Sequence, residues 1–520
     1  TVVGEKSFTF GNILDVTGRK SMAIGDTNIV AGINSFSGGY NNKTSGNNSI
    51  SFGSECNAMG YGSIALVSLL ASVNDYCFSE GCGNIALGYG SHVENCQNIA
   101  GAKYIFKIES YDAVGKKFTF DDTYIGFADA FVALSIGEKL FIQNFNFINT
   151  ALIFTVHSIE SDGKSIVVEE DIPSSKFIAH FATIIKPSSN YYSCHAEGRN
   201  TIAAGNECSH AEGYATEALG FCSHTEGRST KATGSQSHAE GFETVASGGQ
   251  SHAEGYKTEA RGNYSHAGGY YSIANGNFQM AIGRYNSESE TGGNGDFFII
   301  GAGSSPNSRS NAFRISNAGS VYAKGNYNSS GADYAEFIRP WADGNPDNED
   351  RVGYFVTIKD GYLYKAEADD YIVGITSGNP SVVGNSDEEY YWRWERDEFN
   401  RVVYEEVEEY TEKFDEEGNP VLEDGKPIMI PTGRMEKRMK QAAGYDGSLQ
   451  QSYVERKDRP EWDYVGMIGV VPVRDDGTCV AGSYCRCGTG GIATLADMRG
   501  FDTYMVLERI ADNIVSVILK

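Results

Sequence analysis

The stretch "SHAEGYKTEARGNYSHAGG" (251–269) contains two Ser-His steps that lie fourteen residues apart. The same step, followed by Ala or Thr, then Glu and then Gly, occurs at Ser209, Ser223 and Ser237. A fixed short period is typical of a repeat architecture in which each unit packs only on its neighbours. The stretch therefore predicts a solenoid.

The fourteen-residue frame extends well beyond these phrases. A first run begins with "SFTFG" at Ser7 and continues to about residue 104, and a second run begins at Cys194 and fades at Gln279. Fourteen residues are too few for a strand and a helix, but they suffice for two short strands and two turns. Such coils stack at about 4.8 Å, the spacing of hydrogen-bonded strands.

Side chains alternate within the Ser-x-Ala-x-Gly phrase. Ser, Ala and Gly are expected to face the interior of a narrow roll, and the two variable residues are expected to face outward. In the first run the outward pair is apolar, as in Phe8 and Phe10 or Ile50 and Phe52. Such rows need a partner surface, and the simplest one is the same face of identical chains around a symmetry axis.

The phrases "SMAIG" (21–25) and "NIALGYGS" (84–91) resemble the left-handed parallel β-roll of YadA-type trimeric adhesin heads, which consists of fourteen-residue coils. The resemblance covers residues 7–104 and 194–287. It implies a homotrimer and says little about the ligand. The predicted fold class is therefore all-β, with a left-handed parallel β-roll in a homotrimer.

In the second run, His and Glu occupy the two outward positions. If these rows face the trimer axis, they form a polar ladder, which is weaker than an apolar one but more specific in register. Pairing with Glu should raise the His pKa values. A purely structural ladder and a metal stack with three His per layer are the alternatives, and we expect no metal. The predicted ladder consists of His210, His224, His238 and His252 with Glu212, Glu226, Glu240 and Glu254.

Composition excludes two classes of partner. The net charge is −26, whereas nucleic acids and anionic membranes attract Lys and Arg patches. The chain has no run of eighteen apolar residues, so we expect no membrane insertion. It starts at Thr1 without an initiator Met or a signal peptide, which we interpret as an expressed fragment or a processed product.

The ten cysteines form two groups of interest. The spacing of the C-terminal group matches no standard zinc module, so we expect free thiols in a reducing cytosol at Cys479, Cys485 and Cys487. The repeat itself spaces a second group, for which we expect buried small side chains stacked along the coils, at Cys194, Cys208 and Cys222.

The chain is too long for one ordinary domain. Alternating β-branched and aromatic segments between the two runs indicate a small β-barrel or sandwich inserted into the roll, which would serve receptor contact or act as a spacer. The acidic stretch 395–428 favours an exposed β-hairpin arm. The predicted domains are a β-roll at 1–104, an inserted β domain at 105–192, a second β-roll at 193–290, a β junction at 291–332 and a C-terminal domain at 333–520.

The segment "SSGADYAEF" (329–337) is the candidate for chemistry. Asp333 and Glu336 are three residues apart, so a helical turn would place both carboxylates on one face. One of them would then stay protonated near neutral pH, and the pair could protonate or attack a nearby backbone carbonyl. Pairs of this spacing are also common as helix N-terminal charges. Ser330 is an alternative nucleophile, although the segment holds no Lys or His to activate it.

Several phrases resemble the intramolecular-chaperone autoproteolytic cleavage domain of the peptidase G-two family, found at the C-termini of phage neck appendages and tail fibres. They include "NAFRISNAGSVYAKGNYNSSGADYAEFI" (311–338) and "RPEWDYVGMIGVVPVRDDGTC" (459–479). The resemblance implies a domain that helps a trimeric spike to fold and then cuts itself off. It places the scissile bond at Ala332–Asp333 and makes Asp333 and Glu336 the catalytic carboxylates.

We therefore expect a trimeric phage or prophage tail-fibre or receptor-binding spike, assembled in the host cytoplasm and carried on the virion. Its expected partners are itself, a host cell-surface glycan or protein, and other tail or baseplate proteins. We expect no cofactor and no activity beyond a single-turnover self-cleavage. Two alternatives stay open: a bacterial trimeric surface adhesin, and a polysaccharide-degrading tail spike, which would need a cleft with paired carboxylates.

Overall fold

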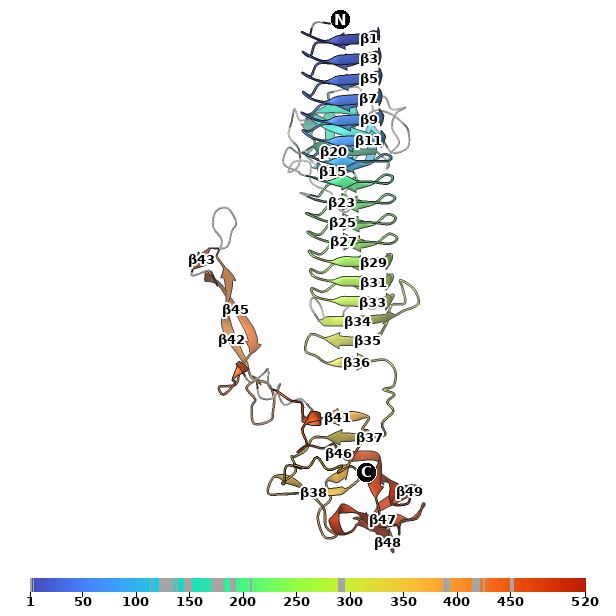
Figure 1. Cartoon of the computed structure of the whole chain (residues 1–520), viewed down its shortest axis with the longest axis vertical. Coiled ribbons are helices and arrows are strands. Elements are labelled where there is room, and N and C mark those ends of the chain that lie inside the picture. Colours follow the sequence, from blue (N-terminus) through green and yellow to red (C-terminus); the bar gives the residue numbers. More distant parts are fainter. Residues whose placement is uncertain are drawn as a thin grey trace. The chain divides into compact units, whose positions relative to one another are not determined.

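The computed structural model (Figure 1) divides into two compact units, Thr1–Asn326 and Tyr327–Lys520. The described elements are strands, apart from two 3-10 turns, η3 (Arg456–Asp458) and η4 (Thr489–Gly491), which confirms the predicted all-β class. The structure describes residues 1–520 except 1, 3, 113, 121–133, 135, 137–138, 145–151, 162, 170–181, 188–192, 206–207, 289–294, 387–392, 414–420, 424–425 and 449–452.

The first unit contains the predicted parallel β-solenoid, in which each coil contributes one strand to each of two sheets. One sheet contains β1 (Phe8–Asn12), β3 (Met22–Asp26), β5 (Phe36–Tyr40), β7 (Ile50–Ser54), β9 (Ile64–Ser68), β11 (Phe78–Cys82), β13 (His92–Val93), β21 (His195–Ala196), β23 (His210–Ala211), β25 (His224–Thr225), β27 (His238–Ala239), β29 (His252–Tyr256), β31 (His266–Tyr270) and β33 (Met280–Arg284).

The other sheet is made of two-residue strands, one from each coil. They are β2 (Asp15–Val16), β4 (Ile29–Val30), β6 (Lys43–Thr44), β8 (Asn57–Ala58), β10 (Ala71–Ser72), β12 (Ile85–Ala86), β14 (Ile99–Ala100), β22 (Ile202–Ala203), β24 (Glu217–Ala218), β26 (Lys231–Ala232), β28 (Val245–Ala246), β30 (Glu259–Ala260) and β32 (Ile273–Ala274).

The coil register follows the sequence period. Strand β3 pairs with β5 so that Met22 lies opposite Phe36, fourteen residues on. The inserted segment does not interrupt this stacking, because β13 pairs with β21 and His92 lies opposite His195. The two runs of coils are therefore one continuous solenoid.

The predicted alternation of side chains is confirmed for Ser and Ala, whereas the Gly of the phrase, also predicted to face the interior, is half-buried at Gly25 and exposed at Gly255. Ser21 and Ala23 are buried, whereas the outward side chains of the first run range from half-buried, as for Met22 and Phe36, to mostly exposed, with Phe10 at 70% and Phe52 at 54%. The glycine of each phrase is required by close packing. At Gly25, φ is +114°, and a Cβ would lie 2.0 Å from the carbonyl oxygen of the next coil.

A column of buried Asn side chains ties the coils of the first run together, a feature that the sequence analysis missed. The Nδ2 group of Asn42 donates to the carbonyl oxygens of Gly38 at 2.7 Å and Gly53 at 3.0 Å, and its Oδ1 accepts the Cys56 N–H at 2.8 Å. Each Asn of this kind thus satisfies backbone groups of its own coil and of the next one.

The inserted segment forms a closed barrel, one of the two predicted arrangements. Its core includes the buried side chains of Phe118, Phe120 and Leu140. Parts of the predicted insert, at 121–133, 145–151 and 170–181, lie outside the described residues. In barrel order the strands are β15 (Ala102–Asp112), β16 (Lys117–Phe120), β19 (Ser165–Val168), β18 (Leu152–Ile159), β17 (Lys139–Asn144) and β20 (Ala182–Pro187).

The solenoid ends in a change of strand direction. Strand β34 (Asp296–Ala302) pairs with β33 in parallel, whereas β35 (Asn311–Ser316) and β36 (Val321–Ala323) follow as antiparallel strands. These strands extend the first solenoid sheet beyond the last coil.

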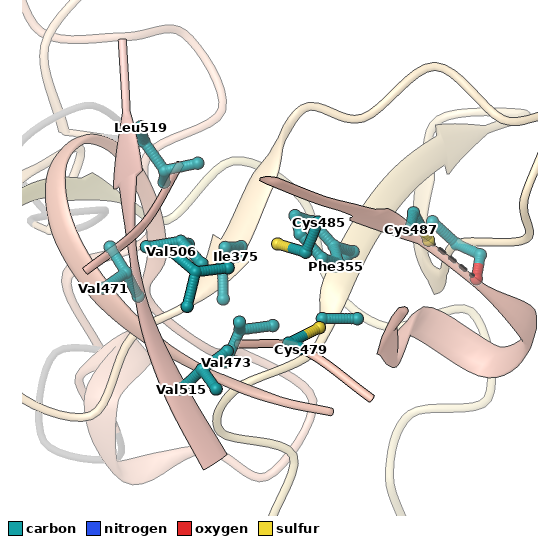
Figure 2. Packing of buried hydrophobic residues seen from close by; sticks show 13 residues of the cluster. Phe355, Ile375, Val471, Val473, Cys479, Cys485, Cys487, Val506, Val515 and Leu519 are labelled. Carbon is teal, nitrogen blue, oxygen red and sulfur yellow. Dashed lines mark hydrogen bonds between the residues drawn. The ribbon is translucent and has the colours of Figure 1, made fainter. Parts of the chain in front are cut away.

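The second unit has a curled sheet with a well-packed core (Figure 2) in which Phe355, Ile375 and Val517 are fully buried. Strand β37 (Asp333–Glu336) pairs with β46 and β41 (Val382–Gly384). The other strands, in sheet order, are β39 (Tyr362–Lys365), β38 (Phe355–Lys359), β40 (Gly374–Thr376), β46 (Val465–Arg474), β50 (Ile514–Leu519), β49 (Tyr504–Ala511), β47 (Tyr484–Cys487) and β48 (Ala493–Ala496).

The predicted hairpin arm exists but extends further along the chain than expected. Strand β42 (Tyr404–Glu412) pairs with β45 (Met429–Met439), which lies beyond the predicted stretch 395–428. The reason is that part of that stretch forms a small hairpin of its own, from β43 (Leu422–Glu423) and β44 (Lys426–Pro427).

Candidate functional site

The segment around Asp333 is a strand, and the predicted helical turn is wrong. Strand β37 pairs with β46 and β41, so its side chains alternate with period two. Asp333 and Ala335 are buried, whereas Tyr334 and Glu336 are half-buried on the opposite face. The two carboxylates that the sequence placed on one face are therefore on opposite faces of one strand.

Asp333 lies in a tight, buried site. Its side chain is 3% exposed, and Oδ1 accepts a hydrogen bond from the Ser377 hydroxyl at 3.0 Å. Its Oδ2 is buried without a hydrogen-bond partner among the described residues. A Cβ at Gly466 would lie 2.6 Å from this oxygen, so the glycine provides the space. Burial raises the pKa of Asp333, while the Ser377 hydrogen bond opposes the shift.

The backbone around the predicted scissile bond is held on both sides. The Ala332 carbonyl oxygen accepts the Val470 N–H of β46 at 3.3 Å. The Asp333 carbonyl oxygen accepts the Ser381 N–H at 2.8 Å and its hydroxyl at 3.0 Å. A Cβ at Gly469 would lie 2.4 Å from the Ala332 oxygen, so β46 packs directly against this peptide bond.

Glu336 and Ser330 lie in different surroundings. The Tyr334 hydroxyl donates to Glu336 on the outer face of β37, and this bond raises the Tyr334 pKa. Ser330 is exposed, and within the described residues no hydrogen bond joins its hydroxyl to a Lys or His side chain. The structure thus brings neither Glu336 nor an activated Ser330 to the carboxylate of Asp333.

The solenoid contains a His–Glu ladder that is longer than predicted. The predicted rings stack face to face, with centroids 4.9 Å apart for His210 and His224, 4.7 Å for His224 and His238, and 4.8 Å for His238 and His252. His92 and His195 extend the stack, with 4.9 Å between their centroids. The sequence analysis missed this extension because the barrel insert separates the two residues along the chain.

Each ring nitrogen faces the carboxylate of the preceding coil. The Nε2–Oε1 distance is 3.2 Å for the hydrogen-bonded pair of His252 with Glu240. The longer contacts are 3.6 Å from His210 to Glu197, 3.9 Å from His224 to Glu212 and 3.7 Å from His238 to Glu226. His266, which lies beyond the predicted rings, forms a hydrogen bond of 3.3 Å with the predicted Glu254.

The expected rise in the His pKa values is wrong. Partial burial and the neighbouring rings lower the pKa values of His210, His224 and His238, because both effects disfavour the imidazolium form more than the carboxylates favour it. The carboxyl groups of the ladder shift one another's pKa values instead. A hydrogen bond with Glu94 raises the pKa of Glu197 to about 7, and the same bond lowers the pKa of Glu94.

The burial of each cysteine depends on its place in the fold. Cys479, Cys485 and Cys487 are buried in the core of the second unit (Figure 2), where burial raises the pKa of Cys487 to about 12. Cys194 is buried in the solenoid as predicted. Contrary to expectation, Cys208 is exposed and Cys222 is only half-buried; both occupy turn positions, with φ of 49° and 47°.

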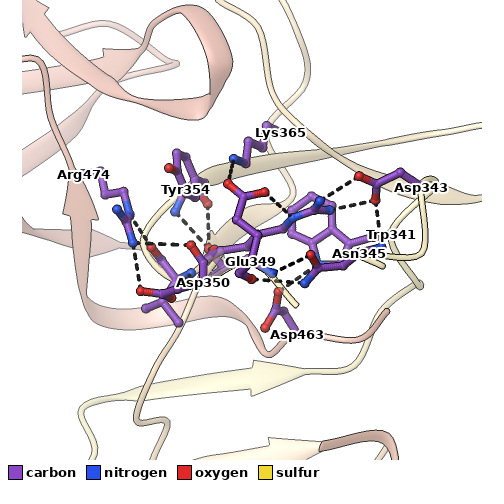
Figure 3. A network of polar contacts seen from close by, with 12 residues as sticks. Trp341, Asp343, Asn345, Glu349, Asp350, Tyr354, Lys365, Asp463 and Arg474 are labelled. Carbon is purple, nitrogen blue, oxygen red and sulfur yellow. Dashed lines mark hydrogen bonds and ion pairs between the residues drawn. The ribbon is translucent and has the colours of Figure 1, made fainter. Parts of the chain in front are cut away.

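A charged network in the second unit also escaped the sequence analysis (Figure 3). Arg351, which is 8% exposed, pairs with Asp343 at 2.7 Å and with Glu349 at 3.0 Å, and its guanidinium carbon lies 4.8 Å from the Trp341 ring centroid. Arg351 holds the Asp343 pKa at about 2, and Lys365 contacts Glu349 at 2.9 Å. These residues line a cavity of about 460 Å³.

The chain thus consists of a β-solenoid followed in sequence by a domain in which hydrogen bonds and close packing hold the Ala332–Asp333 peptide bond. Residues 283–512 match the family model of Peptidase_G2, the IMC autoproteolytic cleavage domain. The C-terminal part of the chain therefore carries a domain of this class, as the resemblance in the sequence implied.

Known proteins of similar sequence come from phages and from a bacterial genome. The pre-neck appendage protein of Bacillus phage B103 is 31% identical over 150 residues, which cover 28% of this chain and 14% of the relative. The putative phage-related protein YobO of Bacillus subtilis strain 168 is 29% identical over 141 residues, or 27% of this chain and 15% of the relative. The matches thus span about one seventh of each relative.

Among solved structures, the C-terminal fragment of bacteriophage phi29 gene product 12 aligns at 26% sequence identity with a TM-score of 0.27. The alignment covers 36% of this chain and 100% of the fragment. Within the described residues, no helix is long and apolar enough to cross a membrane.

Proposed function

We propose that this chain is an appendage fibre of a phage or prophage, carried on the virion, whose C-terminal domain cuts itself from the shaft. The observation that carries the proposal is a cleavage domain, matched at 283–512, that follows a long β-solenoid. The similarity to a pre-neck appendage protein supports the same role.

The shaft is proposed to be a homotrimer whose copies cover each other's apolar rows. In the first run Phe8, Phe10 and Phe52 are more than half exposed in the single chain, and such a continuous row is unfavourable in water. Identical chains around one axis would bury it. In this proposal the C-terminal domain assists trimer folding, and the mature fibre binds a host cell-surface glycan or protein beside other tail proteins.

The proposed cut lies between Ala332 and Asp333, with Asp333 as the reacting carboxylate. One carboxylate oxygen attacks the Ala332 carbonyl carbon through a six-membered ring, and the C=O electron pair moves to the oxygen that accepts the Val470 N–H. The C–N bond then breaks, and the Asp333 nitrogen takes a proton from water. A second water hydrolyses the mixed anhydride, which yields a new carboxyl group at Ala332 and restores the Asp333 side chain.

The structure constrains the role of the second predicted carboxylate. Glu336 lies on the opposite face of β37 and contacts the Tyr334 hydroxyl, so we assign it a positioning role within its own chain. Ser377, which donates to Asp333 Oδ1, orients the reacting group and leaves Oδ2 without a partner among the described residues.

The test is the intact mass of the freshly expressed chain under denaturing conditions, with Asp333→Asn beside Ser330→Ala as the matched control. Asp333→Asn keeps the side-chain shape but removes the nucleophile, so the chain should stay whole. The wild type and Ser330→Ala should each give two fragments, the second of which begins at Asp333.

Two results would overturn this mechanism. Loss of cleavage in Ser330→Ala, with cleavage kept in Asp333→Asn, would make the serine the nucleophile. An uncut wild-type chain would remove the self-cleavage proposal altogether. Glu336→Gln separates the carboxylate roles: a positioning role predicts cleavage slowed by about tenfold or less, and complete loss in a folded variant would show that Glu336 acts directly.

A further inference from the structure

The His–Glu ladder places potential metal ligands close together at every coil step. In each group a His nitrogen lies between the carboxylate of the preceding coil and that of its own coil, and the three ligand atoms lie within 4.8 Å of one another. The groups include Glu80–His92–Glu94, Glu94–His195–Glu197, Glu197–His210–Glu212, Glu212–His224–Glu226 and Glu226–His238–Glu240.

The ring nitrogens of these groups have unmet hydrogen-bonding capacity. The Nε2 atoms of five consecutive rings are buried without a hydrogen-bond partner among the described residues, a costly state for a polar atom. The nearest carboxylate oxygens lie just beyond hydrogen-bond length, at 3.6 Å for His210 and 3.7 Å for His238. The five rings are those of His92, His195, His210, His224 and His238.

The carboxylates of the ladder have unmet charge. Coils stack at about 4.8 Å, so each Glu has a like-charged neighbour on the next coil. Each ring nitrogen also lies close to a carboxylate oxygen, at 3.6 Å for His195 and Glu94 and at 3.9 Å for His224 and Glu212. A cation at this place would offset the repulsion between neighbouring carboxylates.

We propose that the ladder binds divalent transition-metal ions of the zinc class, each held by one His Nε2 and the two flanking Glu carboxylates. An ion at this place satisfies the ring nitrogen and neutralises both carboxylates at once. Tetrahedral zinc with bonds of about 2.0–2.2 Å separates its ligand atoms by about 3.4 Å, close to the 3.6 Å between His195 Nε2 and Glu94 Oε1.

The ligand set and its exposure specify the ion further. Imidazole nitrogen with carboxylate oxygen suits Zn²⁺, Co²⁺ or Ni²⁺, whereas Ca²⁺ and Mg²⁺ prefer oxygen alone. The side chains are about one-third exposed, as for His195 at 34%, so water can complete the coordination shell. Neighbouring groups share a Glu, so ions occupy alternate groups, which gives about three ions over the five named groups.

The test is a zinc titration of the EDTA-treated full chain, with bound metal measured after removal of free ions. We expect at least three ions per chain, because the chain contains two further groups beside the five named ones, and no comparable binding of Ca²⁺. The variant Glu212→Gln/Glu226→Gln removes ligands from three of the named groups and should lower bound zinc about twofold or more. The matched control Glu243→Gln/Glu259→Gln changes the same charge on later coils of the same run, at carboxylates that pair with Lys257 and Arg261 instead.

A second measurement keeps the test decisive if the ladder variant does not fold. Bound Co²⁺ in the wild-type chain should give the visible absorption of mixed nitrogen–oxygen coordination, and excess Zn²⁺ should abolish it. Absence of stoichiometric zinc and cobalt binding by the wild type would overturn the proposal. Equal loss of zinc in the ladder variant and the control would overturn it as well.

Discussion

The coils at 7–104 and those at 193–290 share one fourteen-residue backbone but differ in their side-chain interactions. In most coils of the first run the outward pair is apolar and partly or largely exposed, and buried Asn residues such as Asn42 bond to their own coil and to the next. In the second run the outward pair is His and Glu. The inward residue is Thr, as at Thr244, whose hydroxyl bonds only to its own coil.

The comparison shows which positions of the repeat determine the backbone and which can vary. The small inward residues and the glycines determine the coil, because a Cβ at Gly39 would lie 2.0 Å from the next coil, just as one at Gly255 would lie 2.3 Å from it. The outward pair is not needed for the backbone. The outward pair can therefore differ between the runs: we propose that it forms an interface between chains in the first run and binds metal ions in the second.

The largest effect should come from charging the apolar row of the first run. Phe10→Asp with Phe52→Asp puts unpaired carboxylates on the face that the proposal buries between copies, so the chain should sediment as a monomer. Phe221→Asp with Phe278→Asp, at exposed positions of the second run, is the control and should leave association unchanged. An assembly that survives the first change would show that this row is not the interface.

A smaller effect should come from changes inside the coils, where we expect the loss of Asn42 in the first run to cost more stability than the loss of the Thr244 hydroxyl in the second. Asn42→Ala removes three hydrogen bonds to backbone groups, two of them buried and one partly buried, at about 1 kcal/mol each, so local stability should fall by about 3 kcal/mol. Thr244→Val removes one hydrogen bond and should cost about 1 kcal/mol. Hydrogen exchange of the solenoid amides measures both. Equal effects would mean that the Asn column does not tie the coils together.

The smallest effect is a pH response confined to the second run. The folded pKa values of His210, His224 and His238 lie below the unfolded value, so the unfolded chain binds protons first as the pH falls. These groups therefore cost no stability above the unfolded pKa and destabilise the second run as the pH drops below it. The triple His→Gln variant at these positions should lose less stability than the wild type between pH 7 and pH 5.5, measured by hydrogen exchange. If the variant loses as much stability as the wild type or more, the lowered pKa values assigned to these His residues are contradicted.

The sequence predicted the solenoid because its period is a local property that repeats. The phrase around Ser21 alone specifies which side chains point inward, and the structure follows it. The continuity of the ladder across the barrel was not predictable in this way. His92 and His195 meet because the barrel's first and last strands pair with each other, a contact between distant segments.

The surroundings of the predicted cleavage site could not be predicted from local sequence. The spacing of Asp333 and Glu336 suggested a helical turn, but tertiary pairing with β46 and β41 makes the segment a strand. The groups that surround Asp333, namely Ser377, Gly466 and Val470, come from segments at least forty residues away, and no local pattern marks them. The family resemblance predicts which bond is cut, and the fold shows which residues contact that bond.

The most direct test of the account is native mass spectrometry of the freshly purified wild-type chain, followed by denaturation of the same sample. The account predicts an assembly of three shaft chains, each ending at Ala332, with the C-terminal fragment beginning at Asp333. A monomer with the full 56.4 kDa mass would contradict both the self-associating shaft and the self-cleaving domain.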